Sequence, residues 1–148
     1  MKVKKLMSKI SLALALGVIA SGVSTIPAYA ANIKDKEFNF RVGYDSTTQA
    51  GETTERAKED SSSVYIKPSN YRDLCIKTFG YRNGSWNNDT KNGYAIVTKG
   101  EWLIHNYIYE RGSRSAKLNI TTATPGTSGI ATGVWSPDSV GSYTVANP

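Results

Sequence analysis

The chain has one cysteine and one histidine, and these two side chains could form a nucleophile–base pair. Cys75 lies in the apolar run Leu74-Cys75-Ile76, where a buried thiol that packs as a small hydrophobic group is the alternative. His105 lies in a second apolar run, and nothing in the sequence brings the two residues together, so packing explains both better. A zinc site needs three or four nitrogen or sulfur ligands, which this pair does not supply. A lone cysteine excludes a disulfide within the chain and leaves one between chains open.

Motifs for other chemistry are absent or incomplete. After the first thirty residues there is no Gly-x-Ser-x-Gly elbow. Residues 88–93 resemble the start of a calcium loop, but Lys99 stands where the bidentate glutamate belongs, so a turn is favoured. A carboxylate pair for glycan hydrolysis could come from five residues, of which no two stand out: Asp73, Asp89, Glu101, Glu110 and Asp138. We therefore predict no catalytic residue, no metal site and no cofactor.

Aromatic side chains beside turn residues favour binding over catalysis. Trp86 follows a turn and is close in sequence to Tyr81 and Arg82, and Trp135 precedes a second turn. Rings in such places can stack on the apolar faces of sugars or anchor a protein partner. Core packing is the alternative; it is favoured for Trp135 and equal to binding for Trp86. The candidate ligand contacts are Tyr81, Arg82, Trp86 and Trp135.

The first thirty residues have the order of a cleavable secretory signal peptide. Lysines come first, and an apolar run over 10–20 follows. Small residues then end the segment, with Ala28 and Ala30 at the −3 and −1 positions of a cleavage site before Ala31. The apolar run is well short of the roughly twenty residues that span a bilayer as a helix. We predict a signal-peptide helix in 1–30 and a single secreted, extracellular domain in 31–148, without stable membrane insertion.

Cleavage changes the charge of the protein. Four of the 18 basic residues lie in the signal peptide, so 14 remain against 12 acidic ones, a net charge of +2. Basic and acidic residues are interspersed, whereas nucleic-acid-binding proteins carry a clustered basic stripe. We therefore expect no nucleic-acid partner. A length of 118 residues fits one domain with one core.

Glycine-containing turns divide the chain into strand-sized segments. Asn83-Gly84 is the strongest hairpin signal, because a type I′ turn needs two residues with positive φ. β-branched and aromatic residues dominate the segments between turns, which predicts an all-β fold, a small antiparallel β-sandwich or meander. The predicted strands include 38–42, 64–67, 74–82, 85–89, 94–98, 101–110 and 115–122.

Three segments have a less clear pattern. Residues 101–110 fit a helical stripe or a central strand, and the flanking glycines and aromatic content favour the strand. The polar segment 49–63 predicts a loop or a polar edge strand. A short solvated helix is the less favoured alternative, since Glu52 and Arg56 have i, i+4 spacing but no apolar stripe is present. Residues 121–148 are rich in proline and glycine and predict mostly turns, with Ile130, Val134 and Trp135 reaching the core.

Two segments resemble motifs of small secreted Gram-positive proteins of a domain-of-unknown-function family. Residues 56–67 resemble the family's R-x-K…S-S-V-Y-x-K stretch, and residues 133–140 resemble its G-x-W-S-P-D-S-V signature. The resemblance implies no activity and no catalytic residues. Lactococcin-type bacteriocins are a more distant likeness, because they are also signal-bearing, poor in cysteine and rich in β-structure.

The sequence thus predicts a secreted, non-enzymatic protein that binds a cell-wall or surface ligand at the cell envelope, with a bacteriocin-like antagonist as one form of this function. The alternatives are a hydrolase acting on cell-wall glycans and a structural extracellular protein that assembles through strand edges.

Overall fold

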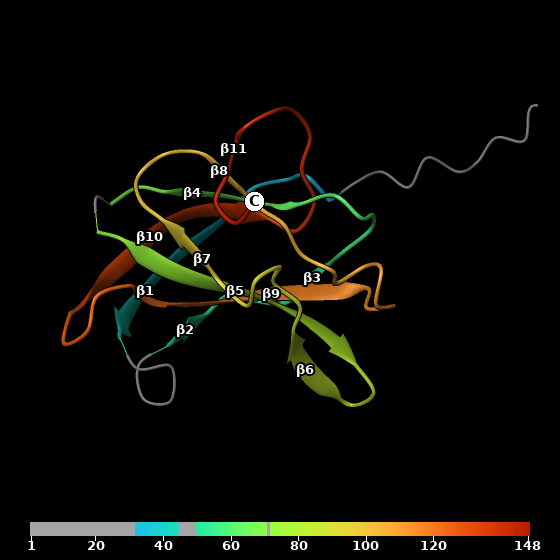
Figure 1. The fold of residues 1–148 in the computed structure, drawn as a ribbon, viewed down its shortest axis with the longest axis horizontal. Coiled ribbons are helices and arrows are strands. Elements are labelled where there is room, and N and C mark those ends of the chain that lie inside the picture. Colours follow the sequence, from blue (N-terminus) through green and yellow to red (C-terminus); the bar gives the residue numbers. More distant parts are fainter. Residues whose placement is uncertain (1–31, 45–49, 71) are drawn as a thin grey trace, which may run out of the picture.

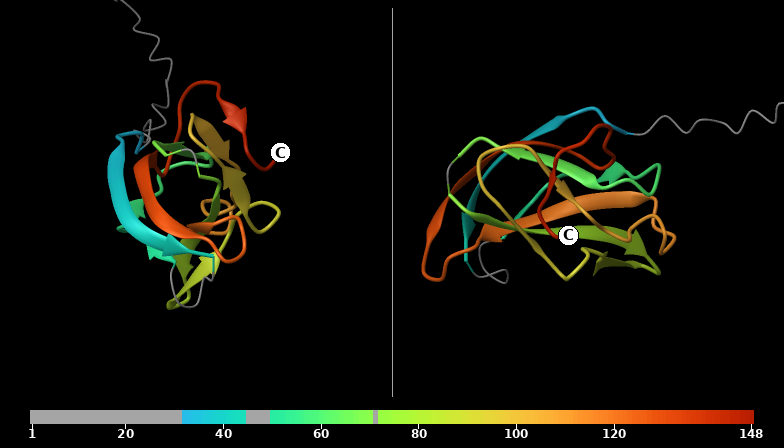
Figure 2. Two further views of the ribbon diagram at one scale, coloured as in Figure 1. Left: turned by 90° about the vertical axis from the view of Figure 1, so that its left-hand side faces the viewer. Right: turned by 45° about the horizontal axis from the view of Figure 1, so that its top comes forward.

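The computed structural model describes residues 32–44, 50–70 and 72–148, which form two β-sheets packed around one core (Figure 1, Figure 2). Sheet A has the strand order β1 (Lys36–Gly43), β10 (Ser128–Ser136), β4 (Val64–Pro68), β8 (Trp102–Ile104) and β11 (Thr144–Val145). Sheet B is built on β9 (Ser115–Thr122) and β5 (Leu74–Arg82); β2 (Gly51–Glu52) and β3 (Arg56–Ala57) pair with β9, and β6 (Ser85–Asn88) and β7 (Ala95–Val97) pair with β5.

The predicted all-β class is confirmed. All described strand pairs are antiparallel except β8 with β11, which is parallel. The part of the chain that the structure describes contains no helix with the length and apolar character needed to cross a membrane. The predicted signal-peptide helix and the cleavage-site residues Ala28, Ala30 and Ala31 lie outside the described residues.

Alternation of apolar and polar side chains places the core between the sheets. In β5 every second residue from Leu74 to Gly80 is buried, while the residues between them face solvent on the other side of sheet B. Strand β1 alternates similarly at Phe38 and Val42, as its sequence predicts. The two sheets contribute together to one continuous apolar core.

The Asn83-Gly84 turn joins β5 to β6 as predicted. Both residues have positive φ, 53° and 78°, and the register pairs Arg82 directly with Ser85 across the turn. A two-residue loop with this geometry matches the right-handed twist of the paired strands. The turn therefore holds the end of β5 and the start of β6 in one fixed register.

The predicted strand over 101–110 is wrong beyond Ile104. Strand β8 covers only three residues; beyond it the backbone at His105 and Tyr107 bonds to residues 89–91 in an isolated bridge, and the side chain of Asn106 makes further local hydrogen bonds. Its Nδ2 donates to the carbonyl of Ile104 at 3.2 Å, and its Oδ1 accepts from the amide of Ile108 at 3.3 Å. Asparagine competes with strand pairing in this way, and the chain continues as turns through Gly112.

The prediction of mostly turns over 121–148 is wrong for 128–136, since β10 is a nine-residue strand between β1 and β4 in sheet A. Trp135 is fully buried, as expected, but Ile130 is 55% exposed and Val134 is only partly buried. Neighbouring strand residues point to opposite faces, so Val134 and Trp135 do not enter the core together.

The described part of the polar segment, residues 50–63, forms one edge of sheet B. Strands β2 and β3 are two residues each and pair with β9. The prediction of a polar edge strand is therefore confirmed in the form of two short pieces. Short and interrupted edge strands leave little backbone for pairing with another chain.

Replacing Gly133 with alanine should lower the free energy of unfolding by about 2–3 kcal/mol. Gly133 has a φ of 159°, and a Cβ there would overlap the backbone carbonyl oxygen of Lys67 and lie 2.9 Å from the Cα of Pro68. Backbone atoms of β4 cannot move aside without breaking the β10–β4 pairing. Urea unfolding followed by circular dichroism measures the loss.

Gly129→Ala is the matched control on the same strand. Its Cβ would meet only the flexible side chain of Arg72, at 3.2 Å from Nε, which can move aside. We expect this variant to lose no more than about 1 kcal/mol. Equal losses in the two variants would contradict the close approach of β4 to Gly133.

Candidate functional site

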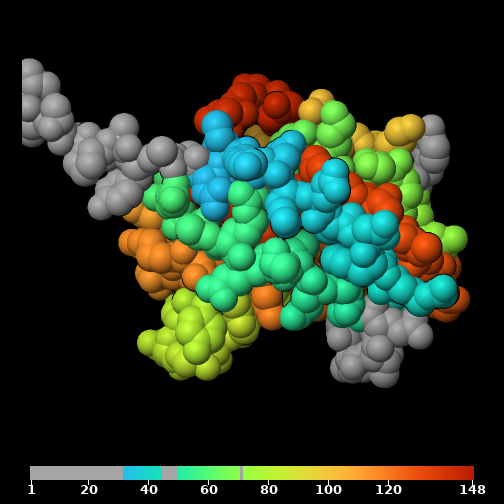
Figure 3. Space-filling model, turned by 180° about the vertical axis from the view of Figure 1, so that it is seen from behind, coloured from blue at the N-terminus to red at the C-terminus, as the bar shows by residue number. Residues whose placement is uncertain are grey.

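An exposed aromatic pair lies on the outer face of the β5–β6 hairpin. Tyr81 and Trp86 are directly opposite in the strand register, and their ring centroids are 5.2 Å apart with planes tilted by 59°. Tyr81 is 45% exposed and Trp86 is partly exposed. The hairpin that carries them projects from the body of the molecule, and it is the yellow-green protrusion in Figure 3.

A basic side chain from the neighbouring strand completes this aromatic cluster. Lys117 on β9 places its Nζ 4.6 Å from the centroid of the Trp86 ring and 2.6 Å from Oε2 of Glu52. Cation–π contact orients the indole, and the carboxylate holds the lysine in place. Tyr81, Trp86, Lys117 and Glu52 thus present two rings and two charges side by side on the outer face of sheet B.

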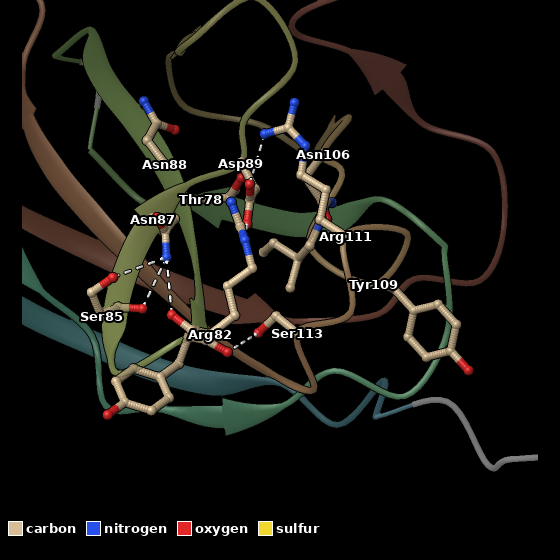
Figure 4. A network of polar contacts seen from close by, with 12 residues as sticks. Thr78, Arg82, Ser85, Asn87, Asn88, Asp89, Asn106, Tyr109, Arg111 and Ser113 are labelled. Carbon is tan, nitrogen blue, oxygen red and sulfur yellow. Dashed lines mark hydrogen bonds and ion pairs between the residues drawn. The ribbon is translucent and has the colours of Figure 1, made fainter.

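Buried Asp89 anchors the base of the hairpin from the inner side (Figure 4). Its carboxylate accepts from Arg82 through Oδ2 and from Arg111 through Oδ1, the latter at 2.8 Å. The backbone amide of Asp89 donates to the carbonyl of Thr78 at 2.9 Å. Arg82, a candidate ligand contact, therefore faces this carboxylate and has a positioning role. Asp89 is occupied by two guanidinium groups, which supports the interpretation of 88–93 as a turn.

The same outer face of sheet B is hollowed at its other end. A cavity of about 780 Å³ is lined there by Tyr44, Cys75, Tyr94 and Ile96, together with β9 residues. Tyr44 and Tyr94 are about half exposed. Cys75 and Tyr81 lie six residues apart on one face of β5, which corresponds to about 20 Å along the strand. Aromatic side chains therefore stand at both ends of one solvent-facing surface.

Cys75 and His105 are not brought together by any described contact. Cys75 is on β5 in sheet B, paired with Thr121 and Ile96, whereas His105 follows β8 in sheet A. The thiol is partly rather than fully buried, contrary to the sequence prediction, because it lies on the outer face. Partial burial still raises the pKa of the Cys75 thiol, which keeps it protonated and weakly nucleophilic.

The two motif segments meet at a fully buried ion pair. Lys58, from the first segment, donates to Oδ1 of Asp138, from the second, at 2.6 Å, and both side chains have no exposed surface. Lys58 also donates to the carbonyl of Ser62 at 2.5 Å, and the amide of Glu59 donates to Oδ2 of Asp138 at 3.0 Å. The amide of Ser139 also donates to Ser62 Oγ. These contacts join residues about 80 positions apart.

Asn32, the first described residue, is hydrogen-bonded to the same Lys58–Asp138 pair. The amide of Asn32 donates to Oδ2 of Asp138 at 2.8 Å, and its side-chain Nδ2 donates to the carbonyl of Ala57. Arg56 donates to Oδ1 of Asn32 at 2.6 Å and to the carbonyl of Trp135 at 3.1 Å. Asn32, the second residue after the predicted cleavage site, thus belongs to the folded domain.

The sequence profile of a family described as "Protein of unknown function (DUF2712)" matches residues 26–139. The chain belongs to the DUF2712 family. This confirms the predicted membership of a domain-of-unknown-function family, and the match includes both Lys58 and Asp138. No curated protein and no solved structure matches the chain. The likeness to lactococcin-type bacteriocins stays a prediction.

Trp135 lies in the core of this DUF2712 chain. Its side chain has 0% exposure, and Arg56 packs over the ring with its Cζ 5.6 Å from the centroid. A ring in this position does not reach a ligand in solution. Of the four candidate ligand contacts, the structure therefore leaves Tyr81 and Trp86 exposed together, turns Arg82 toward Asp89 and buries Trp135.

The five candidate carboxylates have separate surroundings in the DUF2712 chain. Asp89 and Asp138 are buried against cationic side chains, and Asp73 and Glu110 are exposed. Glu101 accepts from the hydroxyl of Tyr65 at 2.8 Å. Among the described residues no three His, Cys, Asp or Glu side chains gather as a metal site would require. No described contact selects two of these carboxylates as an acid–base pair.

Stability of the DUF2712 chain should fall in acid because of Asp138. Burial opposes ionisation of this carboxyl, but the ammonium of Lys58 and the amides of Asn32 and Glu59 outweigh it and hold the pKa of Asp138 below its ordinary value of 3.8. The unfolded chain then takes up this proton first, so the contribution is present above about pH 4 and is lost as pH falls below it.

Urea midpoints measured from pH 6 to pH 2 test this prediction. We expect the difference in stability between the unchanged chain and Asp138→Asn to be constant above about pH 5 and to shrink below about pH 4. A difference that stays constant down to pH 2 would show that the Asp138 carboxyl does not titrate as the buried pair requires.

Proposed function

We propose that this protein is a secreted, non-enzymatic binding protein that attaches to a polysaccharide of the cell envelope through the outer face of sheet B. The observation that carries the proposal is the pair of aromatic groups at the two ends of that face, Tyr81 with Trp86 and Tyr44 with Tyr94. The surface from Cys75 to Tyr81 extends about 20 Å along β5, which matches an extended polymer of several sugar units better than a single small molecule.

The chemistry of the surface fits a sugar chain. Aromatic rings cover the apolar faces of sugar rings, and the polar side chains between the two groups can exchange hydrogen bonds with hydroxyls. Lys77, which lines the cavity and is partly exposed, is one such polar side chain. Lys117 and Glu52 add one charge of each sign beside Trp86.

The arrangement of reactive groups supports binding rather than catalysis. The Cys75 thiol has a raised pKa and lies in a different sheet from His105, and Asp89 is held by Arg82 and Arg111. Secretion is part of the proposal and rests on the sequence of residues 1–30.

Binding to insoluble wall material tests the proposal. Residues 31–148 are mixed with cell-wall sacculi from a Gram-positive bacterium, the walls are sedimented, and the free protein is measured over a range of wall concentrations. Trp86→Ala and Tyr94→Ala should each weaken binding by on the order of ten-fold, since stacking of one ring contributes about 1 kcal/mol or more. The double variant should bind more weakly than either.

Tyr107→Ala is the matched control, because this tyrosine is 40% exposed and lies outside the aromatic surface. Its binding should equal that of the unchanged chain. Loss of binding in the control, or full binding by both Trp86→Ala and Tyr94→Ala, would contradict the proposal.

The same mixtures distinguish the other functions. Growth of live cells measured in parallel detects the bacteriocin-like form of the function, in which wall binding inhibits related cells. Soluble reducing ends released from the walls would instead favour the glycan hydrolase. Fibres that form with rising protein concentration would favour the structural protein.

A further inference from the structure

A groove lies on the outer face of sheet A, whereas the aromatic surface lies on sheet B. It has a volume of about 540 Å³, within the range of small-molecule sites. Strands β4 and β10 form its floor, the segment before β1 contributes one wall, and the loop between β10 and β11 contributes the other. Residues far apart in the sequence thus enclose one space.

The floor of the groove is a fixed polar cluster. Tyr65 is only 8% exposed, and its hydroxyl donates to Oε1 of Glu101 at 2.8 Å. Lys67 approaches the same oxygen at 3.5 Å, with both side chains about half exposed. Burial, followed by the bond to Glu101, raises the pKa of the Tyr65 phenol, so this hydroxyl stays a donor and the glutamate stays an acceptor.

The walls combine a second carboxylate with apolar side chains. Asp35 lines the groove and lies close enough to Tyr65 to influence its phenol. Tyr143 packs on Tyr65 with ring centroids 5.1 Å apart and remains 38% exposed. Ile33 and Val140 are exposed at the rim, at 44% and 60%. Apolar side chains exposed to water beside two carboxylates fit a ligand that has both an apolar part and a polar or charged part.

We infer that this groove binds a primary ammonium group carried on an aliphatic stem, such as a lysine side chain of a peptide. Two carboxylates, Asp35 and Glu101, and one cation, Lys67, line the groove, so its charged lining has a net negative charge. An ammonium supplies three donors and the opposite charge. The stem would pack on Ile33 and Val140, and the exposed face of Tyr143 favours a nearby cation.

Pentylammonium is the simplest probe of this inference, with 1-pentanol and pentanoate as matched compounds of the same stem. Residues 31–148, which contain every described strand, are titrated with each compound and followed by amide and side-chain NMR shifts. We expect saturable shifts at Tyr65, Val140 and Tyr143 with pentylammonium, and binding at least ten-fold weaker for the alcohol and the carboxylate. Equal responses to all three compounds would overturn the charge-based assignment.

Charge-removing variants complete the test. Glu101→Gln and Asp35→Asn should each weaken pentylammonium binding by at least three-fold, while Glu110→Gln, which removes a carboxylate outside the groove, should leave it unchanged. Circular dichroism confirms folding of each variant, and both substituted side chains are exposed enough that the fold should persist. Unchanged affinity in both groove variants, or equal loss in Glu110→Gln, would overturn the inference. Wall binding through sheet B is independent of either result.

Discussion

Replacing Asp138 with alanine should lower the free energy of unfolding by about 3–5 kcal/mol. The substitution leaves the ammonium of Lys58, which has no exposed surface, with only the more distant carboxylate of Asp60, at 3.9 Å, as its counter-charge. It also removes the acceptor of the Asn32 and Glu59 amides, so three donors lose the Asp138 carboxylate at once. Urea unfolding of residues 31–148, followed by circular dichroism, measures the loss.

A double variant separates the unpaired charge from the lost backbone bonds. Lys58→Met with Asp138→Asn leaves no charge in the interior, while the amide oxygen of asparagine can still accept from Asn32 and Glu59. We expect it to regain at least half of the stability that Asp138→Ala loses, because a buried pair costs most when one partner remains alone. A loss below about 1 kcal/mol in Asp138→Ala would show that Asp60 or water compensates the charge of Lys58.

Trp135→Ala should cost about 3–5 kcal/mol, the second large effect. Trp135 is among the largest fully buried side chains of the described chain and is directly opposite Lys36 on β1 and Ile66 on β4. Its removal leaves a cavity between the sheets and takes away the ring over which Arg56 packs.

Trp135→Phe is the informative comparison. The indole Nε1 is buried and has no hydrogen-bond partner among the described residues, so phenylalanine keeps an aromatic ring and removes an unsatisfied donor. We expect its cost to be less than half that of alanine. A phenylalanine variant as unstable as the alanine variant would mean that Nε1 has a partner in solution, such as a buried water.

Much of the fold was predictable because its signals are local. The Asn83-Gly84 turn and the alternation in β5 define a hairpin from adjacent residues alone. The errors arose where a single side chain or a single close contact determines where a strand runs or ends. Strand β8 ends where Asn106 bonds to its own neighbours and bridges to Thr90, and Gly133, from the segment predicted as turns, lies within β10 in close contact with β4.

The candidate sites were predictable only in part. Tyr81 and Trp86 could be paired because the hairpin turn sets their register. Lys58 and Asp138 were each inside a motif segment, but a lysine in a polar stretch carries no local sign of burial, and its partner is 80 residues away. The sheet A groove depends on Asp35, Tyr65 and Glu101 from three separate elements, so only the sheet order reveals it.

The pairing of β1 with β10 determines when this chain can fold. A polypeptide that leaves a ribosome or a transport pore with its amino end first exposes residues 36–43 long before residues 128–136 are available to pair with them. The hydrogen bond from the amide of Asn32 to Asp138 likewise cannot form until residue 138 is available. Such distant pairings slow folding and leave early strands open to other chains. A cell that makes this protein therefore has to keep its first strands apart from other nascent chains until synthesis or transport is almost complete.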